Sequence, residues 1–165
     1  MSDPVDMIVG IVALNGGKLV GRTRLQKTVY LLDACGMDSG LDYEYHNFGP
    51  FSVDVAEAAD DACLLGTLRA EEYPGYHEVP YTVYTASASP PAAVGGMIAN
   101  EAKVKLAAMG DYTAIELELA ATYHYLKVNG YPANTSAEVA RRKPTKATPD
   151  RMKRAKRLLT DLGLM

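Results

Sequence analysis

The sequence has few of the features that define common membrane, secreted or catalytic proteins. Its 165 residues include no tryptophan, two cysteines and three histidines. No apolar run approaches the ~20 residues that a membrane-spanning helix needs. The first residues also lack the basic and then apolar segments of a secretory signal peptide. These absences predict a cytoplasmic protein that does not enter a membrane.

The histidines and cysteines do not form a recognisable site. His46, His77 and His124 are scattered, and none has a metal-ligand spacing to Cys35 or Cys63. The chain has no Gly-x-Ser-x-Gly, no His-Glu-x-x-His and no phosphate-binding glycine loop. We therefore predict no enzymatic activity, no metal and no cofactor. Both cysteines fall at apolar positions of predicted helices, which indicates buried free thiols.

Positive charge is scarce in most of the chain and concentrated at its end. The net charge is −3. Residues 1–140 contain 8 Lys and Arg against 18 Asp and Glu, a balance of −10, whereas residues 141–165 contain 9 against 2, a balance of +7. Charge segregated in this way is typical of a protein with a charged partner, which can be another molecule or another part of the same chain.

The first half of the chain has the element order of a winged helix. Apolar residues at helical spacing, together with cap and stop residues, predict three helices: 4–14, 22–35 and 53–65. A short strand is expected from Asp42 to Phe48, followed by a Gly49-Pro50 turn and by Ser52 as a helix N-cap. Residues 67–86 read as a hairpin with Pro74-Gly75 at its tip, and Pro80 indicates an edge strand or a bulge.

The second half is predicted to be helical. It follows the sequence SASPPAAVGG, at 87–96, whose small residues, prolines and glycines indicate a linker. Helices are expected at 97–109, 112–128, 136–142 and from Thr148 to Gly163. The fold class is therefore α+β and mostly helical. We expect a winged-helix-like domain at 1–86 with a β-hairpin wing, and a C-terminal helical region at 97–165 packed on it. The winged-helix half should share one core containing Leu25, Val29, Leu32 and Ala59.

Several motifs resemble the YwgA-like group of small bacterial and archaeal proteins. They are RTRLQKTVYLL, YEYHNFGPFSVDVAEA, LELAATYHYLKVNG and KPTKATPDRMKRAKRLLTDLGL. This resemblance covers nearly the whole chain and implies a winged-helix-like fold, but it implies no agreed activity. More distantly, the Leu-x-Lys-x-x-Tyr and Gly-Pro elements resemble the Panacea domain of antitoxins such as SocA. That likeness implies an antitoxin-like adaptor role.

The third predicted helix is acidic along one face. Asp54, Glu57, Asp60 and Asp61 fall within an arc of about 120° on a helical wheel, and the helix has no Lys or Arg. In winged helices that read DNA this helix enters the major groove, where it would face a phosphate charge every ~1.7 Å. Direct reading of DNA by this helix is therefore disfavoured. The face is either a solvated surface or a protein-binding surface, and its four acids are our candidate protein-binding residues.

The basic C-terminal segment allows the opposite interpretation. Its side chains are suited to phosphate contacts, which require charge and no particular base geometry. The candidate nucleic-acid contacts are Arg141, Arg142, Lys143, Arg151, Arg154 and Arg157. The segment can also dock on the acidic body of its own chain or of a second copy, as in a homodimer.

Two hypotheses follow from these patterns. The first is a non-enzymatic regulatory or adaptor protein that binds an unidentified protein partner through the acidic face. The second is a DNA- or RNA-binding regulator that uses the basic C-terminal helix. The position of the basic segment separates them, because packing on the acidic body favours the first and an open basic surface favours the second.

Overall fold

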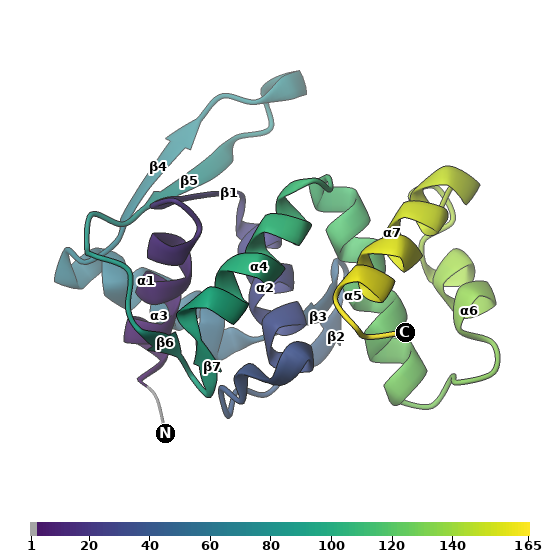
Figure 1. Ribbon diagram of the computed structural model, residues 1–165. Helices are drawn as coiled ribbons and strands as arrows, with labels where there is room; N and C mark the ends of the chain where they lie inside the picture. The colour runs from purple at the N-terminus through teal and green to yellow at the C-terminus, as the bar shows by residue number, and fades with distance from the viewer. Residues whose placement is uncertain (1–2) are drawn as a thin grey trace.

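Seven α-helices and three small antiparallel sheets make up the computed structural model, which describes residues 3–165 (Figure 1). The predicted α+β, mostly helical class is confirmed. The first half contains α1 (Pro4–Leu14), α2 (Arg22–Leu32), α3 (Val53–Leu65) and a hairpin of β4 (Arg69–Tyr73) and β5 (Tyr81–Thr85). The three helices and the hairpin expected in this half are therefore present.

The hairpin belongs to a larger sheet, because a short strand that the sequence did not reveal pairs with it. β1 (Lys18–Val20) pairs antiparallel with β5, so the strand order is β1-β5-β4. β5 is thus the central strand, and the edge strand or bulge inferred from Pro80 is wrong. Pro80 lies just before the first residue of β5, where a missing N–H breaks no pairing. Thr82 and Tyr84 are the buried residues of this strand.

The segment between α2 and α3 is more ordered than a strand and a turn. After α2 the chain makes a π-helical turn (Asp33–Met37), and then β2 (Glu44–His46) pairs with β3 (Gly49–Phe51). Gly49-Pro50, expected as a turn, therefore begins a strand. Ser52 caps α3 as predicted, because its side chain accepts a hydrogen bond from the backbone N–H of Val55 at 3.3 Å.

The second half contains one more hairpin and four helices. They are β6 (Ala93–Val94), β7 (Met97–Ile98), α4 (Ala99–Gly110), α5 (Ala114–Val128), α6 (Thr135–Arg142) and α7 (Pro149–Asp161). The segment 87–96, expected as a linker, includes β6 and lies against α1. Its Pro91 and Val94 are so close to Gly10 that a Cβ added there would be 3.0 Å from each side chain.

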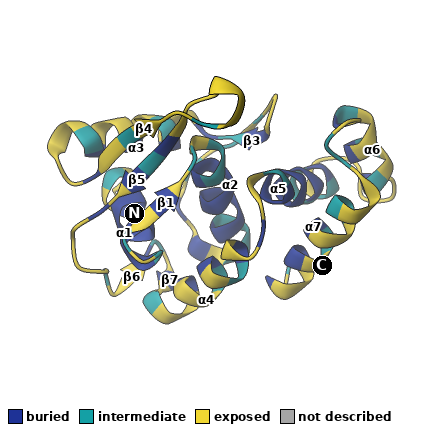
Figure 2. Cartoon of the chain, turned by 90° about the horizontal axis from the view of Figure 1, so that it is seen from above, coloured by how far each residue is buried: buried dark blue, intermediate teal, exposed yellow. Residues whose placement is uncertain are grey.

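One hydrophobic core joins both halves. Leu25, Val29, Leu32 and Ala59 are all at most 2% exposed and belong to this core, as predicted. Helix α5 is the central helix of the second half, because it packs against α2, α6, α7 and β3. It is buried along most of its length, whereas α6 and α7 expose their outer faces (Figure 2). Among residues 3–165, no helix combines the length and the apolar character that crossing a membrane requires.

Candidate functional site

The acidic face of α3 is open to solvent. Asp54, Glu57, Asp60 and Asp61 are all exposed, and none of these four forms an ion pair with a described residue. The helix presents them outward because Val55, Ala58, Ala59 and Ala62 turn the opposite side into the core.

Three of these four acids share a hollow with a residue that sequence reasoning did not select. Asp54, Glu57 and Asp61 line a depression of about 190 Å³ between α3 and the start of α1, together with Asp3. Asp3 is also the N-cap of α1. Asp60 lies outside this hollow, nearer to Cys63 and Tyr84. Burial is the main cause that raises the pKa values of these two residues, and the negative charge of Asp60 also acts to raise them.

The basic segment after α6 is attached to α5 through a buried carboxylate. Glu118 has a side chain only 3% exposed and pairs with Lys143 and with Lys146, each at 2.9 Å. Lys143 is itself 4% exposed and donates a hydrogen bond of 2.6 Å to the carbonyl of Asn47. The ammonium of Lys146 also lies 4.6 Å from the centre of the Phe48 ring. These contacts join the segment to α5 and to the β2–β3 turn.

Helix α7 is attached to α5 through a second buried carboxylate, Glu116, two residues before Glu118. Arg154 pairs with Glu116 at 2.5 Å and donates to the carbonyl of Asp111 at 3.0 Å. Burial alone raises the pKa of Glu116, but the hydrogen bonds from Thr113 and Arg154 outweigh it and lower that pKa. Glu116 also closes a capping box with Thr113 at the start of α5.

The remaining candidate nucleic-acid contacts are only partly free. Arg141 and Arg142 both pair with Glu138, and their hydrogen bonds lower the pKa of that carboxyl to about 2. Arg151 donates to the carbonyl of Lys146 at 3.2 Å. Arg157 lines a shallow hollow between α4 and α7. Of the six residues proposed from the sequence, four are therefore in ion pairs within the chain, namely Arg141, Arg142, Lys143 and Arg154.

Two polar residues of α2 fasten this helix to the start of α3. The amide side chain of Gln26 donates to the carbonyl of Ser52 and accepts from its N–H, both at 2.9 Å. Lys27, only 1% exposed, donates to the carbonyl of Pro50 at 2.7 Å. Burial lowers the pKa of Lys27 to about 8. Sequence reasoning missed both roles, although two polar residues inside an otherwise buried helix were a usable signal.

Gly49 lets β3 approach α5 closely. Its φ is +93°, a region that favours glycine, and an added Cβ would clash with the hydroxyl of Thr122. That hydroxyl has no hydrogen-bond partner among residues 3–165 although it is buried. The Gly-Pro-Phe-Ser sequence is therefore explained by packing, by the Lys27 and Gln26 contacts, and by the helix cap.

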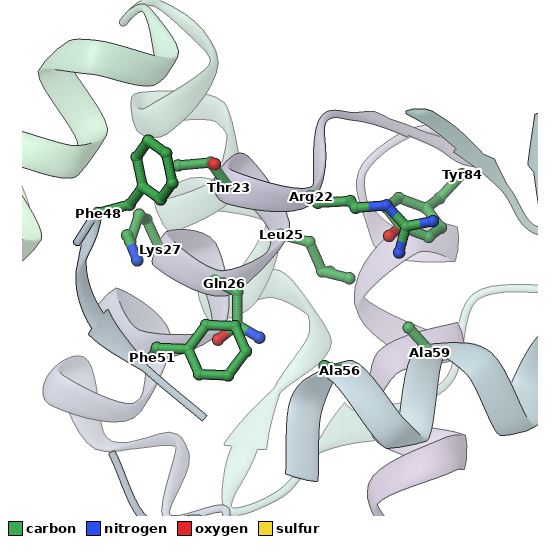
Figure 3. A pocket seen from close by; sticks show the side chains of 10 residues that line it. All are labelled: Arg22, Thr23, Leu25, Gln26, Lys27, Phe48, Phe51, Ala56, Ala59 and Tyr84. Atoms are coloured by element: carbon green, nitrogen blue, oxygen red, sulfur yellow. The ribbon is translucent and has the colours of Figure 1, made fainter. Parts of the chain in front are cut away.

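A cavity of about 410 Å³ lies beside the contacts that α2 makes with Pro50 and Ser52, between α2, α3 and β5. Figure 3 shows the rings of Phe48 and Phe51 on one side, Ala56 and Ala59 of α3 on another, and Arg22 extending towards Tyr84. The rest of the lining comes from Thr23, Leu25, Gln26 and Lys27. Sequence reasoning gave no indication of this cavity.

A polar cluster holds the chain after α2 in place. Asp33 accepts a hydrogen bond of 2.8 Å from the N–H of Ser39, another from the Ser39 hydroxyl, and one of 2.7 Å from the hydroxyl of Tyr43. The Tyr30 hydroxyl is hydrogen-bonded to Nδ1 of His124 at 2.7 Å. Burial lowers the pKa of His124 and raises that of Tyr30. Because these groups mainly satisfy one another, the cluster fastens the 33–43 segment to α2 and α5.

Cys35 and Cys63 are free thiols, as predicted, but both are half-buried rather than fully buried. Among residues 3–165, no three His, Cys, Asp or Glu side chains gather in a way that could hold a metal ion.

Comparison with known proteins gives one informative similarity. No protein-family model matches the chain. The chain is 28% identical over 71 residues to the uncharacterized protein YwgA of Bacillus subtilis (strain 168). The matched region is 42% of this chain and 43% of that protein. This similarity supports the YwgA-like resemblance seen in the motifs.

Proposed function

We propose that this protein is a non-enzymatic regulatory or adaptor protein that binds a positively charged protein partner through the acidic face of α3. The observation that supports this most is the internal pairing of the basic segment. Lys143, Lys146 and Arg154 are paired with Glu118 and Glu116 of α5, so three of the nine bases in residues 141–165 pair with acids of the acidic body.

The charge that α3 presents to a partner is acidic. The exposed carboxylates of α3 and the hollow beside α1 form a negative surface that suits Lys or Arg side chains. A duplex would be repelled by the same surface. An antitoxin-like role is the specific form that the resemblance to the Panacea domain implies for such an adaptor.

We also propose that residues 4–86 are a winged helix with its groove-reading role absent. The chain order α1, β1, α2, the short β2–β3 pair, α3 and the β4–β5 hairpin, together with the sheet order β1-β5-β4, supports this arrangement. In it α3 occupies the position of the recognition helix and β4–β5 that of the wing.

The test compares two triple charge reversals that change the net charge equally. The first replaces Asp54, Glu57 and Asp61 by Lys. The control replaces three exposed acids elsewhere by Lys, namely Glu101, Asp111 and Asp150. Both proteins are expected to fold, because exposed charges contribute little to stability. The wild type and both variants are used as baits in lysate of the source organism, with and without nuclease, at low and high salt.

We expect partner recovery to be resistant to nuclease, to fall with salt, and to be lost only in the α3 reversal. Equal recovery by all three baits would contradict the proposed surface. A random DNA duplex is titrated in parallel at 150 mM salt. Binding tighter than the ~10⁻⁴–10⁻⁶ M typical of non-specific association would favour the nucleic-acid regulator instead. In that case Ala substitutions at Arg151, Arg154 and Arg157 should flatten the salt dependence by about three units on a log–log plot.

A further inference from the structure

The cavity between α2 and α3 has the size of a small-molecule site. Its volume of about 410 Å³ lies within the range of roughly 300–1,000 Å³ that is typical of ligand pockets. A compact organic molecule fits such a space.

The lining gives the cavity an apolar interior. Leu25, Phe48, Phe51, Ala56 and Ala59 contribute only hydrocarbon and ring surface. Two polar lining residues, Gln26 and Lys27, have their polar ends bonded to the backbone of Ser52 and Pro50. An apolar body is therefore the part of a ligand that this interior favours.

The charge of the lining selects the other part of the ligand. None of the lining residues is acidic, although α3 carries four acids on its outer side. Arg22 is exposed at the edge of the cavity and forms no ion pair with a described residue. A guanidinium presents a planar set of donors that matches a carboxylate in two parallel hydrogen bonds.

We propose that this cavity binds a small monocarboxylic acid with an apolar tail. The tail lies between Phe48, Phe51 and the alanines of α3, and the carboxylate pairs with Arg22. This site is separate from the acidic hollow beside α1, and the proposal does not depend on the adaptor function.

Isothermal titration calorimetry of the full chain at pH 7 with four probes tests the ligand class. Octanoate is expected to bind saturably with one site per chain. Octanamide has the same tail without charge and should bind at least ~10-fold more weakly, because it loses a charge-assisted hydrogen bond pair. Octylammonium should bind more weakly still. Butanoate, which is four methylene groups shorter, should bind roughly 200-fold more weakly than octanoate, since each methylene group is worth about fourfold in affinity.

Two variants and one control locate the site. Arg22→Gln should weaken octanoate about 10-fold and leave octanamide within about twofold, whereas Lys103→Gln, an exposed position on α4, should change neither. Ala56→Leu should weaken both probes by filling the cavity. In methyl-labelled NMR spectra of the wild type, octanoate should shift the signals of Ala56 and Ala59 but not that of Ala120 in α5.

Four results would overturn the proposal, and three of them need only the wild type. The first is the absence of saturable octanoate binding below about 1 mM, which corresponds to a binding free energy weaker than about −4 kcal/mol. The second is equal affinity for octanoate and octanamide. Unshifted Ala56 and Ala59 signals, or equal effects of Arg22→Gln and Lys103→Gln, would place any binding elsewhere.

Discussion

Replacing Glu118 by glutamine tests whether α5 holds the basic C-terminal segment. The carboxylate of Glu118 is 3% exposed and lies 2.9 Å from Lys143, which is 4% exposed. Glu118→Gln keeps the shape of the side chain but leaves a buried ammonium without its counter-charge. Loss of one partner from a buried pair typically destabilises a protein by about 3–5 kcal/mol. The second partner, Lys146, is 31% exposed and can turn to water, so its pairing adds only about 0–1 kcal/mol.

Urea denaturation followed by far-ultraviolet circular dichroism measures this loss. With a slope of roughly 2–3 kcal/mol per molar urea, the midpoint should fall by about 1–2 M. Glu57→Gln, at an exposed acid of α3, should change stability by less than about 0.5 kcal/mol. The double variant Glu118→Gln with Lys143→Met should recover most of the loss, because it no longer buries an unpaired charge. A loss below about 1 kcal/mol in Glu118→Gln, or a double variant no more stable than the single one, would refute this reasoning.

Two further predictions concern the contacts of β3 with α2 and with α5. Gly49→Ala should lower the unfolding free energy by about 2–5 kcal/mol, from ~1–2 kcal/mol of backbone strain at positive φ and ~1–3 kcal/mol of overpacking against Thr122. Adding Thr122→Ala should restore the overpacking part in the same urea assay, and a Gly49→Ala protein as stable as wild type would contradict the contact. Burial lowers the pKa of Lys27 from 10.5 to about 8, so above pH 8 the unfolded chain binds the Lys27 proton more tightly than the folded chain does. Stability should therefore rise by about 1.5 kcal/mol between pH 8 and pH 9.5. The rise should be absent in Lys27→Met, and a flat wild-type profile would disprove the assignment.

Sequence patterns located the helices well because the signals that begin and end them are local. Ser52 and Asp3 cap helices through bonds to N–H groups two or three residues away. β1 gave no such signal, since a strand of three residues has no measurable periodicity. Its partner is also distant in sequence, because Lys18 pairs with Thr85. The edge strand or bulge predicted from Pro80 was wrong for a related reason. Only the pairing of β5 with β1 and β4 shows that the strand begins after Pro80.

The candidate site was predictable in its charges but not in its contacts. The imbalance between the two parts of the chain follows from composition alone, and so does the possibility of internal docking. The acids that meet the basic segment were not identified, because Glu116 and Glu118 lie within an apolar helix rather than on the acidic face. Two carboxylates in a helix that is apolar nearly all round were the available signal, since buried acids require cationic partners. The cavity arises from three elements distant in sequence and leaves no local pattern.

In this chain, the residues of the motifs that resemble the YwgA-like group mainly hold the fold together. Leu25 lies in the core, Gln26 bonds to Ser52, and Lys27 bonds to Pro50. Together with Gly49 they fix the angle at which α3 leaves β3, and this angle sets both the direction of the acidic face and the opening of the cavity. The carboxylates of α3 and the guanidinium of Arg22 make none of these bonds. A relative that keeps the contacts of Gln26, Lys27 and Gly49 should therefore keep the position of α3. Its binding chemistry depends on the side chains presented on α3 and at the cavity edge.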